Sequence, residues 1–530
     1  MIGSPPRRVR IGDPARPDSR VTAPHSRMFP HTWRHHWALD EDPFVQEDAD
    51  KDTVLARVPM EAVHSSFDRL YGSTETAGPG IVFGEKGSGK SSLRLAMKRR
   101  LKSDESAKAF FVEYIEFDSF LTEARKADRL PPSGPKTARR VVERFLLADH
   151  IDAMLSLGVS KLADEIADGQ HPSAADLSKK HRASLVALTG LYYRSDDRSG
   201  AEVDVALRKA VGQGAGRSFF KKFGTFLGLV TGIALGVAVV ANDFELELPF
   251  EIENRALWIS LSVSLLVLTG LLTWIPQLIA QRRASRATKA VRVVPRDPDP
   301  LTGLLLRLPA SVRRDLALPE GPAVGTRLVL LQRFIAILRD VGYRNFWVLM
   351  DRIDEATVLS GQADLMRSFV ESLLEHRLLQ FEGLALKLFL PIELSRLYLG
   401  ASPDEQKSMR LDKASSIPEL RWTGQELSQV AAQRLRAVRP EGTPVDQAGG
   451  RLMDFFADDV AESDVREALS ELGTPRLAFG FLGALMAEHA RELNDDLEEG
   501  DPAWRIPQRR FEILRASWLD RARGLRRALN

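Results

Sequence analysis

Residues 84–91 read Gly84-Glu85-Lys86-Gly87-Ser88-Gly89-Lys90-Ser91, a glycine-rich loop that ends in Lys-Ser. The apolar run Ile81–Phe83 precedes this loop, and Ser92–Leu101 after it has the residue spacing of a helix. A strand, such a loop and a helix in that order are the context that a phosphate-binding loop requires. Because its glycines let backbone N–H groups converge on phosphate oxygens, the stretch predicts an α/β domain with a nucleotide at the loop.

Each part of the loop has an expected role in holding a nucleoside triphosphate. We expect Lys90 to reach the β- and γ-phosphates and the hydroxyl of Ser91 to bind Mg²⁺. ATP with Mg²⁺ is the expected ligand, although the pattern does not separate ATP from GTP. The residues expected to contact the nucleotide are Gly84, Glu85, Lys86, Gly87, Ser88, Gly89, Lys90, Ser91 and Ser92.

A second motif lies in Phe346–Asp351, where an apolar run ends in a carboxylate. This pattern is typical of a buried strand that delivers an aspartate to a metal ion, and we expect Asp351 to hold Mg²⁺ through water. Glu355 and Asp354 are the candidates for the residue that positions the attacking water, with Glu355 favoured. The alternative is that either carboxylate caps the helix that follows. Two further strands are predicted at Phe110–Phe117 and Leu384–Leu390.

Between the two motifs lie two apolar segments, Phe223–Ala241 and Ala256–Ile279. Each has close to the roughly 20 residues that cross a hydrocarbon core of ~30 Å. Basic residues flank the pair, whereas the connecting residues 242–255 are acidic. By the positive-inside rule we expect a two-span hairpin in the cytoplasmic (inner) membrane with both termini in the cytoplasm and the lipid bilayer as a partner. The alternative is a buried hairpin of a soluble protein.

The composition excludes several classes of site. The chain has 530 residues, with 74 Lys and Arg against 72 Asp and Glu, and no cysteine. Disulfides and thiolate metal sites are therefore excluded, and the charge balance argues against a general binder of polyanions. Trp504–Asn530 is rich in arginine, which indicates either a basic helix on lipid or nucleic acid or a solvated helix packed through its apolar residues. Nucleic acid is not an expected partner, because no recognition helix or zinc motif is present.

These motifs resemble those of P-loop NTPases of the additional-strand, AAA-related class. Asp351-Arg352-Ile353-Asp354-Glu355 resembles the extended acidic motif of origin-recognition and signalling (STAND) ATPases. Gly473-Thr474-Pro475-Arg476 resembles a second sensor motif, which implies that Arg476 contacts the γ-phosphate from a helical lid. A hairpin inserted between the two halves of the site is similar to the KAP group of P-loop NTPases. The resemblance implies a homo-oligomer with an effector that the sequence does not identify.

The expected fold is an α/β P-loop NTPase with a parallel sheet flanked by helices, an α-helical lid and an inserted two-helix transmembrane hairpin. Its expected units are a disordered segment (residues 1–50), the first half of the ATPase domain with a helical insertion (51–200), the hairpin with basic flanks (201–295), the second half (296–415), the lid (416–495) and an Arg-rich helix (496–530). The expected function is a membrane-anchored, cytoplasm-facing ATPase that hydrolyses ATP or another NTP to drive a conformational switch in bacterial defence or signalling. The alternatives are an ATP-binding regulatory scaffold with little turnover and a membrane-tethered DNA-handling ATPase.

Overall fold

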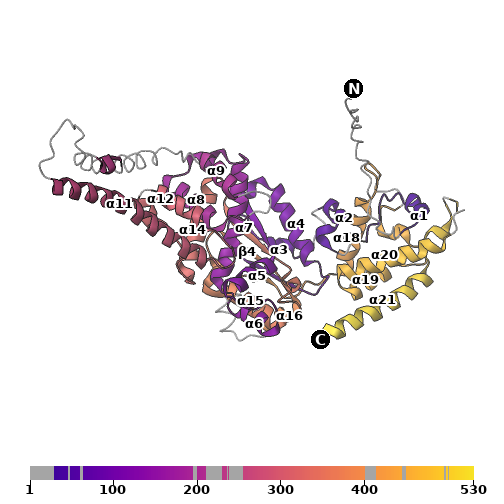
Figure 1. Cartoon of the computed structure of the whole chain (residues 1–530). Helices are drawn as coiled ribbons and strands as arrows, with labels where there is room; N and C mark the ends of the chain where they lie inside the picture. The colour runs from indigo at the N-terminus through magenta and orange to yellow at the C-terminus, as the bar shows by residue number, and fades with distance from the viewer. Residues whose placement is uncertain are drawn as a thin grey trace, which may run out of the picture.

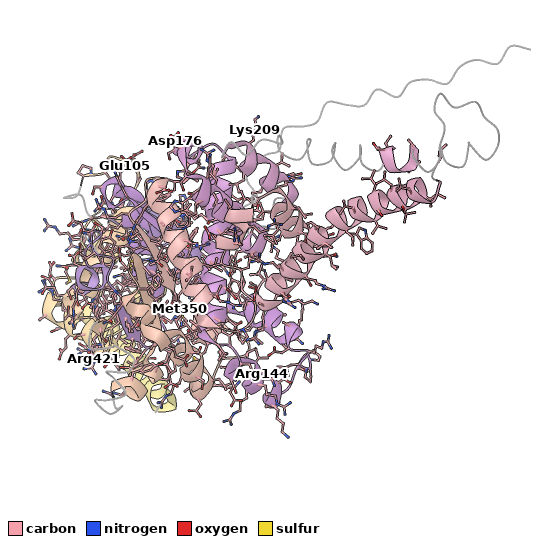
Figure 2. The ribbon with its side chains drawn as sticks, turned by 90° about the vertical axis from the view of Figure 1, so that its left-hand side faces the viewer. Glu105, Arg144, Asp176, Lys209, Met350 and Arg421 are labelled. Atoms are coloured by element: carbon pink, nitrogen blue, oxygen red, sulfur yellow. The ribbon has the colours of Figure 1, made fainter. Side chains whose placement is uncertain are left out.

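A computed structural model of the chain consists of an α/β body, a group of helices beside it, and one long helix that extends from the body on the side away from this group (Figure 1). The group of helices includes the part of the chain predicted as the lid and is called the lid below. The structure describes residues 29–45, 48–59, 64–194, 200–210, 230–234, 237, 255–308, 310–399, 414–444, 449–493, 497–498 and 500–529. Figure 2, turned by 90°, shows the long helix, α11 (Arg255–Ala290), again extending beyond the body.

A five-stranded parallel sheet forms the centre of the body, with the strand order β2-β3-β4-β1-β5. Its strands are β1 (Gly80–Gly84), β2 (Ala109–Tyr114), β3 (Asn345–Met350), β4 (Leu384–Pro391) and β5 (Ser415–Ile417). Every residue of β1, β3 and β4 is buried. Such continuous apolar runs are expected where helices cover both faces of a parallel sheet. The predicted α/β class, with a parallel sheet flanked by helices, is confirmed.

Helices cover the two faces of the sheet in separate groups. On one face, α3 (Phe67–Tyr71) and α4 (Lys90–Ser103) pack against side chains such as Trp347 and Phe389. The larger group shares one hydrophobic core with the other face and consists of α5 (Phe117–Ala127), α6 (Pro135–Glu143), α7 (Leu147–Ala167), α8 (Lys179–Tyr192), α9 (Gly200–Ala210), the end of α11, α12 (Pro298–Arg307), α14 (Val324–Asp340), α15 (Ala363–Leu374) and α16 (Ile392–Leu399). The short α13 (Ala310–Asp315) lies between α12 and α14 in the chain.

The lid has its own hydrophobic core, formed by α18 (Gly424–Ala437), α19 (Glu462–Leu472), α20 (Pro475–Glu492) and α21 (Gln508–Leu529). The N-terminal helix α1 (His31–His36) belongs to this core, because Trp33 is fully buried in it. His36 stacks on Trp504 with ring centroids 4.0 Å apart. Residues 29–45, which we expected to be disordered, therefore build part of the lid, since their aromatic side chains have an apolar surface to cover.

The predicted membrane hairpin is contradicted. Most of Phe223–Ala241 lies outside the described residues, and Ala256–Ile279 lies within α11, a helix of 36 residues. Nowhere in the described ranges is there a helix that combines the length and the apolar character needed to cross a membrane. Ser260, Ser262 and Ser264 alternate with apolar residues near the start of α11, and Ser262 donates to the carbonyl of Gly232. The expectation of a two-span protein of the cytoplasmic membrane is therefore corrected.

Candidate functional site

The glycine-rich loop connects β1 to α4 and takes a conformation that depends on its glycines. Gly87 and Gly89 have φ values of 85° and 92°, a region that residues with a Cβ rarely adopt. A Cβ on Gly89 would lie 3.3 Å from the ring of Trp422, and one on Gly87 would lie 2.7 Å from Cβ of Arg476. The loop is therefore in close contact with the lid.

Lys90 is the first residue of α4, and its side chain is buried. Its ammonium group donates to the carbonyls of Gly84 and Glu85, at 2.7 and 3.1 Å. Burial lowers the pKa of Lys90, an effect that the nearby charges of Asp354 and Asp351 oppose. The ammonium group is thus held inside the loop, with the two acidic residues close enough to act on it.

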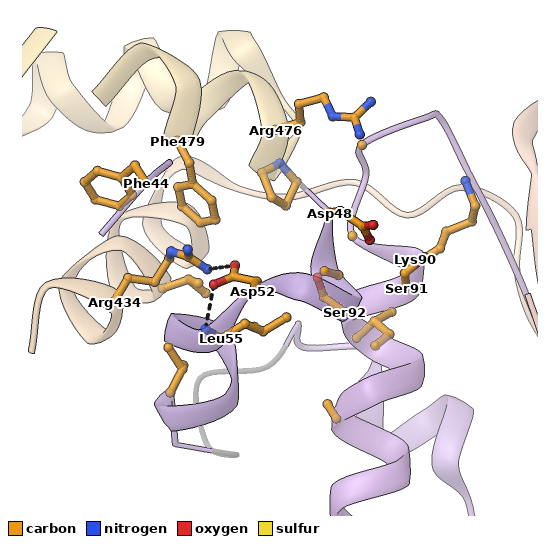
Figure 3. Close-up of a pocket in the computed structure, with 18 of the residues that line it drawn as sticks. Phe44, Asp48, Asp52, Leu55, Lys90, Ser91, Ser92, Arg434, Arg476 and Phe479 are labelled. Atoms are coloured by element: carbon orange, nitrogen blue, oxygen red, sulfur yellow. Dashed lines mark hydrogen bonds and ion pairs between the residues drawn. The ribbon is translucent and has the colours of Figure 1, made fainter. Parts of the chain in front are cut away.

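A cavity of about 570 Å³ opens beside the loop (Figure 3), within the size range of small-molecule sites. Of the residues predicted for the site, Lys86, Gly87, Gly89, Lys90, Ser91, Ser92, Asp351, Asp354, Glu355 and Arg476 line this cavity. Gly84, Glu85 and Ser88 belong to the same loop but are not among the residues that line the cavity. Residues that sequence reasoning missed also contribute to the walls, among them Phe44, Asp48, Asp52, Leu55, Trp422, Arg434 and Phe479.

Asp351 follows β3 and is 1% exposed. One carboxylate oxygen accepts from the backbone N–H of Arg352 at 2.9 Å, and the other accepts from Nε of Arg94 at 3.1 Å. Arg94 lies one turn after Lys90 on α4 and was not predicted. The sequence signal that could have identified Arg94 is its charge, because it lies among the apolar residues Leu93, Leu95, Ala96 and Met97 of this helix.

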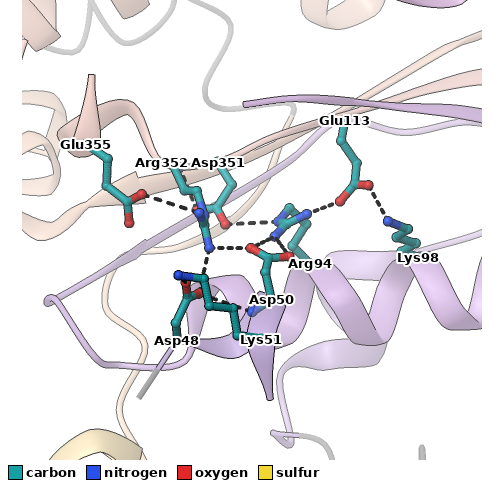
Figure 4. A network of polar contacts seen from close by, with 9 residues as sticks. All are labelled: Asp48, Asp50, Lys51, Arg94, Lys98, Glu113, Asp351, Arg352 and Glu355. Atoms are coloured by element: carbon teal, nitrogen blue, oxygen red, sulfur yellow. Dashed lines mark hydrogen bonds and ion pairs between the residues drawn. The ribbon is translucent and has the colours of Figure 1, made fainter. Parts of the chain in front are cut away.

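Glu355 lies in a short 3-10 helix, η4 (Ile353–Glu355), and its side chain is 55% exposed. Arg352 contacts it at 3.5 Å and also pairs with Asp48, at 2.9 Å, and with Asp50 (Figure 4). Burial favours a lower pKa for Arg352, but the charges of Asp50, Glu355 and Asp48 outweigh it and raise the pKa. Arg352 therefore links Glu355, the candidate catalytic residue, to Asp48 and Asp50 near the start of the chain.

Two residues of the lid donate hydrogen bonds to the loop. The backbone N–H of Arg476, near the start of α20, donates to the carbonyl of Gly87 at 3.3 Å. The indole N–H of Trp422 donates to the carbonyl of Ser88 at 2.7 Å. Arg476, the residue predicted to act from the lid, is thus placed beside the glycine-rich loop.

The N-terminal segment, defined here as residues 48–58, forms one wall of the cavity. Asp52 accepts from Arg434 of the lid at 2.7 Å and from the backbone N–H of Leu55 at 2.9 Å (Figure 3). Sequence reasoning missed this wall. Its signal was the run of acidic residues between Asp40 and Asp52, close ahead of the loop in the chain.

The oxygen donors beside the loop suit Mg²⁺. The hydroxyl of Ser91 and the carboxylate of Asp351 line the same cavity, and hard cations prefer such oxygen ligands. Within the described parts of the chain, no group of three or more His, Cys, Asp or Glu residues is placed to hold a metal ion. A Mg²⁺ ion here would therefore need phosphate oxygens and water to complete its coordination.

Comparisons of the chain with protein-family models, with curated proteins and with solved structures give no match. The resemblance to P-loop NTPases accordingly rests on the sequence motifs alone.

Proposed function

We propose that this chain binds a nucleoside triphosphate with Mg²⁺ beside the glycine-rich loop and hydrolyses it. One observation carries the proposal: Lys90, Asp351 and Arg476, from three distant parts of the sequence, line a single cavity. The strand order supports it, because β4 lies between β1 and β3, as expected for the additional-strand class that the motifs resemble.

The loop and the first turn of α4 would bind the phosphates. Backbone N–H groups of the loop and the helix dipole favour negative charge at this position. Lys90 would exchange its present contacts with the carbonyls of Gly84 and Glu85 for oxygens of the β- and γ-phosphates. Ser91 and Asp351 would hold Mg²⁺, which neutralises charge on the phosphates when bound.

Glu355 is the proposed residue that orients the attacking water, and Asp354 is the second candidate. Both carboxylates line the cavity together with Lys90. The side chain of Glu355 is exposed, and the one side-chain interaction described for it is the contact with Arg352. It can therefore turn toward the γ-phosphate. Arg476 would contact the γ-phosphate from the lid.

The conformational output of this ATPase would be the position of the lid. Trp422 and Arg476 join the lid to the carbonyls of Ser88 and Gly87. Phosphate binding and release would reorganise these loop peptides, and the lid would respond because it is bonded to them directly.

Turnover of ATP by purified wild-type and variant proteins tests the proposal. Lys90→Ala is expected to lose both nucleotide binding and turnover, whereas Glu355→Gln is expected to keep binding and to slow turnover about 10²-fold or more. Lys126→Ala and Glu382→Gln are the matched controls, because these two side chains are 59% and 88% exposed. Wild-type turnover no faster than that of Lys90→Ala would contradict hydrolysis.

An ATP-binding scaffold with little turnover is the second candidate. It would hold where the contact between Arg352 and Glu355 persists with nucleotide bound, because the carboxylate would then not turn toward the attacking water. Tight binding of ATP by the wild type with no release of phosphate would support this alternative. The DNA-handling alternative gains no such support, since Arg510 pairs with Glu492 and Arg515 pairs with Glu471 inside the lid.

A further inference from the structure

Arg94 joins three carboxylates that come from three separate segments. Its Nε donates to Asp351, one terminal nitrogen donates to Glu113, and the other donates to both carboxylate oxygens of Asp50, each at 2.6 Å (Figure 4). The side chains of Arg94 and Asp351 are each 1% exposed. Because a guanidinium carries its donors in a rigid planar fork, these contacts fix the orientation of Arg94 and thereby of Asp351.

Asp50 is held in place by the segment that carries it. It lies in the short 3-10 helix η1 (Ala49–Lys51), and its side chain is 30% exposed. Arg99 of α4 donates to three carbonyls of the N-terminal segment, those of Leu55, Ala56 and Val58, at 2.9 to 3.1 Å. Arg352 pairs with both Asp48 and Asp50. The backbone of the N-terminal segment is therefore anchored to α4, and this anchoring keeps the carboxylate of Asp50 next to Arg94.

The charges around Arg94 determine how much of the charge of Asp351 is available to a cation. Glu113 is shared with a second cation, Lys98, and Asp50 is shared with Arg352, so both carboxylates contribute to the charge that compensates Arg94, and Asp50 does so through two hydrogen bonds. Without Asp50, the positive charge of Arg94 would act more strongly on Asp351 and would repel a divalent ion bound beside it. In a buried site such effects are larger than in water, because the surroundings screen charges less.

We infer that Asp50 is a positioning residue of the candidate metal site, acting through Arg94 on Asp351 and raising the affinity of the site for a divalent cation. This inference rests on the proposed function, and it assigns a role to a residue that lies outside the motifs. Partners behind the metal ligands commonly change metal affinity about 10- to 100-fold.

The test is a titration with Mn²⁺, followed by electron paramagnetic resonance, of protein in complex with a non-hydrolysable ATP analogue. In Asp50→Asn, the Mn²⁺ concentration at half-saturation is expected to rise about tenfold, the lower end of the range for such partners, because Asp50 is partly exposed. The affinity for the analogue in EDTA is expected to stay unchanged. Asp50→Glu, which keeps the charge, is expected to restore most of the Mn²⁺ affinity.

Asp48→Asn is the matched control, because Asp48 is on the same segment and pairs with Arg352 but not with Arg94; its shift is expected to be under about threefold, below the range for partners behind the ligands. Asp50→Ser replaces Asp50→Asn if the latter does not fold. The inference is overturned if the Mn²⁺ titration of Asp50→Asn matches that of the wild type. It is also overturned if Asp50→Asn loses as much affinity for the analogue in EDTA as it loses for Mn²⁺. Neither result would contradict the proposed function. A wild type that does not bind the analogue overturns the proposed function as well.

Discussion

The backbone N–H of Arg476 donates to the carbonyl of Gly87 across 3.3 Å, so that the first turn of α20 is bonded to the glycine-rich loop. The indole of Trp422 adds a second bond, to Ser88, between residues 334 positions apart. The lid therefore contacts the peptide groups that would receive the phosphates. A change of the loop can reach the lid without any intermediate element.

Gly87→Ala is expected to separate the loop from the lid. The added Cβ would lie 2.7 Å from Cβ of Arg476, at a position where φ is already +85°. Gly361→Ala is the matched control, because Gly361 has a φ of +71° and no atom within 4 Å of its added Cβ. Hydrogen exchange at the start of α20 is expected to rise in Gly87→Ala and not in the control. Equal exchange in the two variants would show that the contact does not hold the lid.

Trp422→Phe is expected to destabilise the protein by about 1–3 kcal/mol, because the buried carbonyl of Ser88 loses its donor while most of the ring remains. The free energy of unfolding in urea measures this loss. Trp274→Phe is the control: Trp274 is 76% exposed, and a change within about 0.5 kcal/mol is expected there. A similar stability of both variants would mean that the bond to Ser88 contributes little.

The sequence predicted the centre of the sheet well because the signal there is local. The runs at Ile81–Phe83 and Leu384–Leu390 lie within β1 and β4. The strand predicted at Phe110–Phe117 ends earlier, at Tyr114, and Phe117 begins α5. A short apolar run has no period that separates a strand end from a helix start, and Phe117 is buried in either structure.

The parts that sequence reasoning missed depend on contacts between distant segments. Asp50 and Arg94 are 44 positions apart, and neither belongs to a local pattern. The prediction of a membrane span within α11 was wrong for the same reason, because it used local composition and not contacts with distant segments. The helix continues beyond that stretch, and Ala280, Ala284 and Ala287 near its end pack into the core of the body.

The ion pair between Asp52 and Arg434 is expected to couple the N-terminal segment to the lid. The two side chains are only 5% and 4% exposed. A double-mutant cycle with Asp52→Asn and Arg434→Gln is expected to give a coupling energy of about 1.5 kcal/mol or more, since hydrogen bonds to charged groups contribute roughly 1.5–3 kcal/mol. The control cycle uses Glu41 and Arg57, a pair that is 41% and 46% exposed, for which about 0.2–1 kcal/mol is expected. Coupling energies of equal size would argue against a specific role of Asp52.

Glu426 is expected to make the stability of the lid depend on pH in the acid range. It caps α18 by accepting from Thr423, and it also accepts from the backbone N–H of Ser65 at 3.1 Å. Burial favours a higher pKa, but these hydrogen bonds outweigh it and lower the pKa of Glu426 from 4.5 to about 2. Because the folded state holds this proton less tightly than the unfolded state, its contribution is present above pH 4.5 and is lost as the pH falls through 2.

Glu426→Gln is therefore expected to be less stable than the wild type by about 1 kcal/mol near neutral pH, a figure reduced for the partial exposure of the side chain. The difference in the free energy of unfolding is expected to be constant down to pH 4.5 and to shrink steadily between pH 4.5 and 2. Urea denaturation at a series of pH values measures it. Glu382→Gln is the control, since Glu382 is 88% exposed, and a difference within about 0.5 kcal/mol is expected throughout. A difference for Glu426→Gln that does not change with pH would mean that the charge of the carboxylate plays no part in the cap.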